Sequence, residues 1–205
     1  MKTIGVIATV LLSISLGTFL MAGDNDDDYD KLYKALEPFL TPQIKEMPDQ
    51  KMLEYRVEGD PNIVGGKAFG MLYQAYYSLK EVDKAKNITP RARWSATFTE
   101  TPKDKWIGIY GLPVPNSVSS LPQGADPNVK ISNWKYGTVA EILHVGSYLE
   151  ERPTIEKLHN FIKASGYKIS GYHEEEYVKG PTTFSKGDPK KYLTIIRYPV
   201  EKAEK

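Results

Sequence analysis

The chain has 205 residues, a formal net charge of +1, 40% hydrophobic residues and no cysteine. This length suits one domain, or two small ones, with a tail. The even charge balance excludes the clustered basic surface that nucleic-acid binding requires. The lack of cysteine excludes disulfides, thiolate metal sites and a cysteine nucleophile.

The chain begins with an apolar segment. Residues 3–23 carry no charge, Lys2 precedes them, and Asp24 opens an acidic run. About 20 apolar residues can cross a bilayer as a hydrophobic helix, and a basic start with an acidic exit places the rest of the chain outside the cytoplasm. Residues 1–23 are therefore predicted to be a signal anchor or a cleaved signal peptide. Leu20 suits a cleavage site poorly, which favours the anchor.

Residues 24–50 are predicted to be a linker, because an acidic run is followed by prolines at positions 38, 42 and 48. Some apolar residues in this stretch would share one face of a short helix: Leu32, Leu36, Phe39 and Leu40. The rest of the chain, residues 51–205, is predicted to form the domain.

The first half of this domain, residues 51–115, is predicted to contain a strand, a helix and two further strands. The strands cover residues 52–57, 92–99 and 106–112. The helix buries one face, because its apolar residues recur at i, i+3, i+4 and i+7: Leu72, Ala75, Tyr76 and Leu79. Residues 113–134 contain prolines and no periodic pattern, so they are predicted to be a loop.

The second half, residues 134–202, repeats this order. Its predicted strands cover residues 137–145, 167–171, 174–178 and 192–200. The helix between the first two strands buries Ile155, Leu158 and Ile162, and Gly166 is placed to end it.

The two halves also end alike, at Pro113-Val114 and Pro199-Val200, which lie 86 residues apart. The repeat predicts an α+β fold made of duplicated β-α-β-β units. Each unit would be an antiparallel curved sheet with one packed helix, and a cleft would lie between the two units. Such a seam is a common place for a small-molecule pocket.

Glu175 and Tyr177 are the strongest candidates for a site at this seam. They lie two residues apart on a predicted strand, so their side chains share one face, while Glu174 and Glu176 would point the other way, to solvent. A carboxylate among aromatic rings attracts cations. If buried, its pKa should rise, which would suit general acid or base chemistry. The alternative is that all three glutamates form a solvated strand edge.

The sequence predicts no metal site and no cofactor. Its three histidines, His144, His159 and His173, are not paired at i+3 or i+4. His173 precedes glutamates 174–176, but consecutive strand residues point to opposite faces and cannot all converge on one ion.

Five elements of the second half together resemble the DNA gyrase inhibitor-like (GyrI-like) family. They are the His144-x-Gly146-x-Tyr148 segment, the helix after it, Gly166-Tyr167, Glu175-x-Tyr177-Val178 and the final Tyr198-Pro199-Val200. The resemblance covers residues 134–200, and the same order recurs more faintly over residues 52–114. The family includes the effector-binding domains of bacterial multidrug-responsive transcription activators.

The resemblance implies a hydrophobic pocket between the halves, in which Glu175 meets cationic or polar ligands. It further implies aromatic walls, supplied by Trp94, Phe98, Tyr110 and Tyr177. Some members are similar enough to suggest hydrolysis of strained electrophilic molecules, which would make Glu175 catalytic. The chain has no helix-turn-helix domain, so the transcription-factor role does not carry over.

Three functions follow as hypotheses. The first is a binding module for a small amphipathic or cationic molecule, acting as a sensor or a sequestering protein. It would be anchored in the membrane by residues 3–23 with its domain outside the cytoplasm, or secreted or periplasmic after cleavage. The second is a hydrolase that uses Glu175. The third is a protein-interaction module with a vestigial pocket, which a solvent-exposed Glu175 would support.

Overall fold

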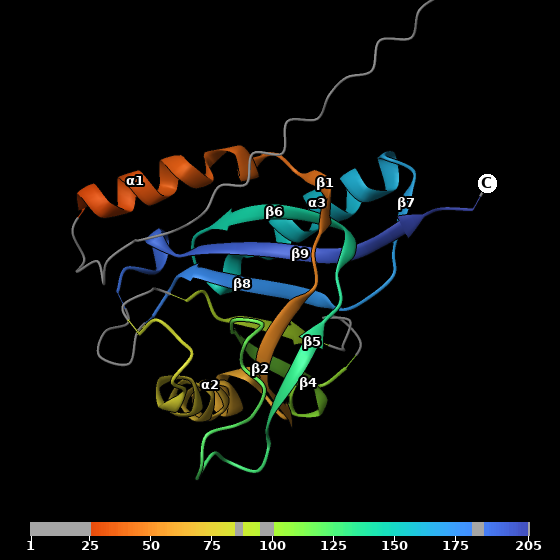
Figure 1. Cartoon of the computed structure of the whole chain (residues 1–205). Coiled ribbons are helices and arrows are strands. Elements are labelled where there is room, and N and C mark those ends of the chain that lie inside the picture. Colours follow the sequence, from red (N-terminus) through yellow and green to blue (C-terminus); the bar gives the residue numbers. More distant parts are fainter. Residues whose placement is uncertain (1–25, 85–87, 95–100, 182–186, 205) are drawn as a thin grey trace, which may run out of the picture.

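The computed structural model describes residues 26–84, 88–94, 101–181 and 187–204 (Figure 1). Its strands are β1 (Gln43–Met47), β2 (Gln50–Glu58), β3 (Arg91–Trp94), β4 (Ile107–Pro113), β5 (Val129–Trp134), β6 (Gly137–Val145), β7 (Tyr167–Ile169), β8 (His173–Lys179) and β9 (Leu193–Lys202). Its α-helices are α1 (Asp26–Leu36), α2 (Pro61–Ser78) and α3 (Arg152–Ala164). Four short 3-10 helices accompany them: η1 (Glu37–Leu40), η2 (Lys103–Lys105), η3 (Tyr148–Glu150) and η4 (Pro189–Lys191).

The α+β class and the duplicated unit are confirmed. The sheet order is β1-β6-β9-β8-β3-β4-β2-β5, and β7 pairs with the end of β9. In this order β2, β3 and β4 of the first half correspond to β6, β8 and β9 of the second half, respectively. With these equivalences the strand order is the same when read from either edge of the sheet. Every pairing is antiparallel.

The two halves differ from the prediction in one respect, because their strands join into one continuous sheet. The junction is the pairing of β3 with β8, in which Ala92 lies opposite Glu175 and Arg93 lies opposite Glu174. The edge strand of a sheet has unpaired backbone N–H and C=O groups that can pair with another strand. Here the inner edge strands β3 and β8 pair with each other. The seam of the repeat is therefore a strand pairing.

The stretches predicted to be a linker and a loop contribute further strands. β1 pairs with β6 of the second half, and β5 pairs with β2 of the first. The strand that precedes each half thus pairs with the outer strand of the other half. Residues 43–47 show no apolar alternation, and the alternation of Val129 and Ile131 spans only four residues after a proline-containing stretch, which is why neither segment was predicted as a strand.

The two long helices α2 and α3 pack on one face of the sheet. α2 begins after Asp60, whose carboxylate accepts the backbone N–H of Asn62 at 2.9 Å. It buries Leu72 and Tyr76 against β2 and β4, as the periodicity predicted. α3 buries Leu158 and Ile162 against β6 and β9, and Gly166 follows it with a φ of 75°.

The short helix α1 lies on the opposite face of the sheet, within the stretch predicted to be a linker. Leu36 at its end is buried against Leu143 of β6 and Ile195 of β9. The predicted apolar residues Leu32, Leu36, Phe39 and Leu40 all pack in this cluster, although a 3-10 helix takes over from α1 after Leu36.

The predicted hydrophobic segment, residues 3–23, lies outside the described residues. Within the part of the chain that the structure describes, no helix is both long and apolar enough to span a membrane.

Candidate functional site

The candidate site lies on β8, the strand that joins the two halves. His173, Glu175 and Tyr177 alternate along it and face the side on which α2 and α3 pack, with Glu175 between Ala92 of β3 and Ile196 of β9. The prediction that Glu175 and Tyr177 share a face is therefore confirmed. Glu175 is 7% exposed, so it is not part of a solvated strand edge.

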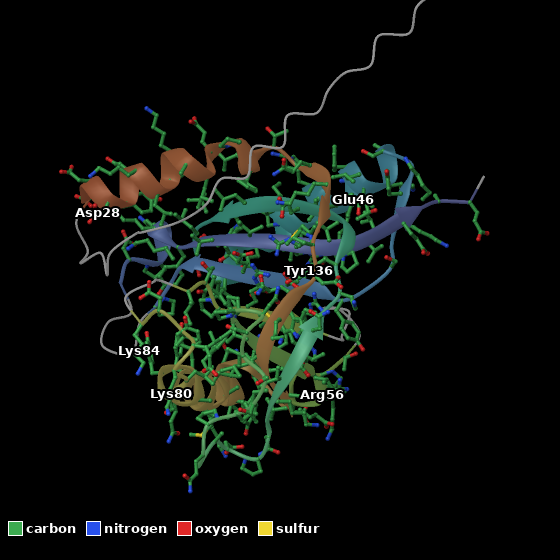
Figure 2. The ribbon with its side chains drawn as sticks, in the orientation of Figure 1. Asp28, Glu46, Arg56, Lys80, Lys84 and Tyr136 are labelled. Carbon is green, nitrogen blue, oxygen red and sulfur yellow. The ribbon has the colours of Figure 1, made fainter. Side chains whose placement is uncertain are left out.

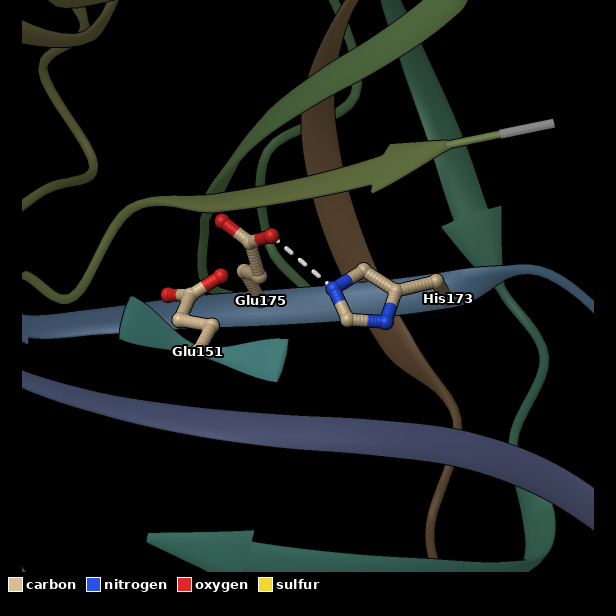
Figure 3. A group of neighbouring side chains, drawn as sticks. All are labelled: Glu151, His173 and Glu175. Carbon is tan, nitrogen blue, oxygen red and sulfur yellow. Dashed lines mark hydrogen bonds and ion pairs between the residues drawn. The ribbon is translucent and has the colours of Figure 1, made fainter. Parts of the chain in front are cut away.

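The Glu175 carboxylate is held by hydrogen bonds from its own strand. The Tyr177 hydroxyl donates to Oε2 at 2.7 Å, and His173 Nε2 lies 2.8 Å from Oε1 (Figure 3). The other ring nitrogen of His173 lies 2.7 Å from the Tyr198 hydroxyl. A buried chain of polar groups therefore runs from Tyr198 through His173 and Glu175 to Tyr177.

The charge state of Glu175 differs from the expected one. Burial acts to raise its pKa, as the sequence suggested, but the hydrogen bond and charge of His173, the hydrogen bond from Tyr177 and the charge of His144 outweigh it. The pKa of Glu175 therefore lies below its ordinary value. Near neutral pH this buried group is a carboxylate.

A second carboxyl group, Glu151, lies beside Glu175 and was missed by the sequence analysis. It directly precedes α3, is 6% exposed, and its Oε1 has no hydrogen-bond partner among the described residues (Figure 3). Burial, then the negative charge of Glu175 and a hydrogen bond to it, raise the pKa of Glu151 to about 9. Nothing local marks Glu151 as buried, because acidic residues before a helix are usually solvated.

Aromatic rings from both halves surround these carboxyl groups. The Tyr177 ring meets Tyr148 edge-on at 5.6 Å and Phe69 of α2 at 5.9 Å. Phe69 in turn contacts Tyr110 at 5.0 Å, and Tyr110 contacts Trp94 at 5.3 Å. These centroid distances are those of favourable aromatic pairs.

The structure brings most, but not all, of the predicted site residues together. Glu175, Tyr177 and Tyr110 lie in one cluster, and Trp94 contacts Tyr110 from behind, whereas Phe98 lies outside the described residues. The pKa of Tyr110 is raised by burial and by the charge of Glu175, and its hydroxyl has no hydrogen-bond partner among the described residues. Phe69 and Tyr148 were not predicted as walls of the site, because a local pattern does not show which aromatic rings meet Tyr177 across the fold.

A cavity of about 220 Å³ lies next to this cluster, at the end of β8. Its lining includes Tyr29 of α1, Gly180 and Tyr192. Tyr192 packs on Tyr148 at 5.2 Å, and the Tyr148 hydroxyl lies so close to Gly180 that a side chain there would collide with it. Glu175 and Tyr148 do not line this cavity, and its link to the cluster is the contact of Tyr192 with Tyr148.

The opposite face of β8 carries Glu174 and Glu176. Glu174 accepts from Arg197 Nη1 at 2.6 Å and from Arg93 Nε at 2.7 Å, and it is 1% exposed. Glu176 accepts from Arg197 Nη2 at 3.1 Å and pairs with Arg91. The prediction that these two glutamates point to solvent is wrong, because arginines of β3 and β9 lie on the same face.

Tyr136 completes this ionic face at the centre of the molecule (Figure 2). Its hydroxyl donates to Glu174 at 3.1 Å and accepts from Arg91 Nη1 at 2.7 Å. Arg197 also donates through Nε to buried Glu141 at 2.9 Å. Glu141, Glu174 and Glu176 on this side thus each have an arginine, whereas neither Glu151 nor Glu175 has an arginine or lysine partner in the described part of the chain.

The fold and the site together define an α+β domain of two repeats with a buried carboxylate at their junction. The profile of the GyrI-like small molecule binding domain family matches residues 40–201. The chain belongs to this family. The match begins near β1, in agreement with the part that this strand plays in the sheet. No curated protein matches the chain significantly.

Several solved structures share the fold. An uncharacterized conserved protein from Listeria innocua has 22% identity and a TM-score of 0.67, over 83% of this chain and 98% of that one. A hydrolase from Listeria innocua has 21% identity and a TM-score of 0.65, over 84% and 98%. The EcmrR C-terminal domain has 15% identity and a TM-score of 0.61, over 80% and 98%.

Proposed function

We propose that the domain binds a small amphipathic cation, with Glu175 as its counter-charge and the rings of Tyr177, Tyr148, Phe69 and Tyr110 as its apolar walls. The observation that carries this proposal is a buried, ionised carboxylate that lies among aromatic rings and has no arginine or lysine partner among the described residues. Membership of a small-molecule-binding family supports it.

The physical reason for a cation is the environment of the buried charge on Glu175. An ionised carboxylate out of water is costly unless it is paired and hydrogen-bonded. His173 and Tyr177 supply hydrogen bonds, but no arginine or lysine of the described residues pairs with Glu175. A ligand cation is attracted by Glu175 and by the faces of the rings together.

The ligand would enter by displacing aromatic side chains. Glu175 is shielded by Tyr177 and Tyr148, and the cavity lined by Tyr192 lies next to this pair. A rotamer change of Tyr148 would open a path from that cavity to the carboxylate. Ordering and moving such side chains on binding costs about 0.5–1.5 kcal/mol each, which the contacts of the ligand must offset.

A sensor or sequestering role outside the cytoplasm is the cellular part of this proposal. It rests on the charge pattern around residues 3–23, with Lys2 before them and an acidic run after them. An anchored protein would stay in the membrane fraction after carbonate extraction, whereas a protein whose leader is cleaved would appear in the soluble extracytoplasmic fraction.

The binding test is a fluorescence titration of the full chain in neutral-lipid nanodiscs with ethidium, a hydrophobic aromatic cation, against empty nanodiscs as the blank. Neutral phenanthridine measures the contribution of the ligand charge. We expect saturable ethidium binding that weakens at least tenfold in Glu175→Gln, about 1.4 kcal/mol, and is unchanged in Glu156→Gln, an exposed carboxylate of α3. Equal binding by wild type and Glu175→Gln would overturn the proposal.

Hydrolysis of a strained electrophile is the second candidate. The observation that favours it is the 2.7 Å contact of Glu175 with Tyr177, which joins a carboxylate base to a phenol acid on one face. A hydrolase from Listeria innocua has a similar fold. Glu175 would take a proton from water as the water attacks, and Tyr177 would donate to the leaving oxygen. Turnover of an epoxide panel that vanishes in Glu175→Gln would support this candidate, and binding without turnover would exclude it.

A further inference from the structure

Three donor groups converge on one point of the helix-covered face. Glu151 comes from the start of α3, and His173 and Glu175 come from β8. One ligand atom of each lies within 4.8 Å of the others, and all three residues are buried (Figure 3). His173 and Glu175 lie two residues apart on β8, so their side chains share a face and can bind one ion. Glu174 and Glu176 point to the other face.

Glu151 provides a second, independent observation. Its Oε1 is buried and has no hydrogen-bond partner among the described residues, although the side chain is directed toward Glu175 (Figure 3). Leaving a buried acceptor unsatisfied costs about 1–3 kcal/mol. The ion pairs of the described chain give neither carboxyl group an arginine or lysine. Among the described residues, therefore, no arginine or lysine lies between the two carboxyl groups.

We propose that Glu151, His173 and Glu175 form a binding site for a divalent transition-metal ion of the zinc type. One imidazole nitrogen and two carboxylate oxygens are a donor set that Zn²⁺ accepts. Mg²⁺ and Ca²⁺ prefer oxygen ligands alone, so the histidine discriminates against them. Two carboxylates and one divalent ion give a neutral site, which suits its burial.

The geometry needs only side-chain adjustment. Bonds to zinc are about 2.1 Å long, so tetrahedral donors lie about 3.4 Å apart. His173 Nε2 and Glu175 Oε1 are already 2.8 Å apart, and the widest separation within the three-atom set is under 4.8 Å. Rotation of the Glu151 side chain, which no hydrogen bond to Oε1 restrains, can close the remaining gap.

The groups behind the ligands are already in place. The Tyr198 hydroxyl lies 2.7 Å from His173 Nδ1, and the Tyr177 hydroxyl donates to Glu175 Oε2. Both contacts persist when the metal takes Nε2 and Oε1, and such outer contacts orient the ligands of protein metal sites. Three protein ligands leave a fourth position for water or for a donor atom of a bound molecule.

The metal site shares Glu175 with the proposed cation site but does not require an organic ligand. A bound metal would neutralise both carboxylates and remove the attraction for an organic cation. The two would therefore compete, and metal binding would regulate the pocket.

The test is a calorimetric titration of the chelator-treated, tag-free full chain in neutral-lipid nanodiscs with ZnCl2, followed by Co²⁺ absorption spectroscopy. We expect one Zn²⁺ per chain, intense tetrahedral Co²⁺ bands, and an affinity at least 100-fold weaker in Glu151→Gln and in Glu175→Gln. The matched control is Glu156→Gln, which removes an exposed carboxylate from α3 and should change nothing.

Circular dichroism of each variant checks that it is folded, and the wild-type stoichiometry does not depend on any variant. No 1:1 binding by wild type, or equal affinity in the folded Glu151→Gln variant, would overturn the metal site. Ethidium binding without Zn²⁺ binding would defeat this inference alone. Zn²⁺ binding without ethidium binding would uphold it and defeat the proposed cation site.

Discussion

The two faces of β8 treat the same residue type in opposite ways. Glu174 and Glu176 lie in a network with Arg197, Arg93 and Arg91. Glu175 between them is hydrogen-bonded to His173 and Tyr177 and has no arginine or lysine partner among the described residues. A carboxylate that is fully paired with arginines stabilises the fold and has no charge left to attract a ligand. An incompletely compensated carboxylate still attracts a cation, and that difference locates the site.

The ionic face also explains how the halves recognise each other. β3 carries arginines where the matching strand β8 carries glutamates, so Arg91 lies opposite Glu176 and Arg93 opposite Glu174. Two copies of the first half would place arginine against arginine, and like charges directly opposite in a sheet are destabilising. The charges at the seam therefore specify the pairing of unlike halves.

The largest effect is expected from removal of the central cation of the ionic face. Arg197→Met leaves Glu141, Glu174 and Glu176 with incomplete compensation in a buried place, so we expect a loss of about 3–5 kcal/mol in the free energy of unfolding. Urea denaturation measures it. Arg152→Met removes an exposed pair with Glu156 and should cost under about 1 kcal/mol. Equal losses in the two variants would contradict the contrast.

The second prediction compares the same substitution at two neighbouring glutamates. Glu174→Gln removes a charge from Arg197 and Arg93 and should lower the free energy of unfolding by about 1–3 kcal/mol while leaving ethidium affinity unchanged. Glu175→Gln should do the reverse, with at least tenfold weaker binding and a smaller stability loss. Denaturation and ethidium titration of both variants decide it, and the same ranking in both measurements would count against the two-face description.

The third prediction concerns pH, in the presence of a chelator. The pKa of Glu151 is about 9 in the folded chain against an ordinary 4.5, because of burial and the charge of Glu175. The folded state thus keeps a proton that the unfolded state releases, and stability falls as pH rises from about 4.5 to about 9. Glu175, with its lowered pKa, contributes stability that is lost only as pH falls below its ordinary value.

Glu151→Gln mimics the protonated form, so its stability relative to wild type should rise between pH 5 and pH 9. Urea unfolding at pH 5, 7 and 9 measures this difference. A difference that does not change with pH would show that Glu151 has an ordinary pKa.

The smallest effect is expected from one hydroxyl group. Tyr177→Phe keeps the ring but removes the donor to Glu175 Oε2, so stability should fall by about 0.5–1.5 kcal/mol and the pKa of Glu175 should rise. Ethidium affinity should weaken only a few-fold at neutral pH and fall faster than that of wild type as pH is lowered. Tyr172→Phe, a change at a half-exposed tyrosine, is the control and should alter neither quantity. An affinity loss as large as that of Glu175→Gln would assign Tyr177 a larger role than hydrogen bonding.

Much of this molecule was predictable from local sequence. The helices around Leu72 and Leu158, the repeat with its Pro-Val endings, and the shared face of Glu175 and Tyr177 follow from periods of 3.6 and 2 residues. These features depend on neighbours along the chain, which the sequence displays directly.

Local patterns thus predict the class of fold, the repeat and the strand that carries the site. Three other features became visible only in the folded chain: the halves join in one sheet, β1 and β5 each pair with the outer strand of the other half, and Glu151 meets Glu175. These features depend on partners far apart in the chain. Arg93 and Glu174, for example, lie 81 residues apart. Whether a glutamate is paired, solvated or left for a ligand is set by such partners, and no local pattern records them.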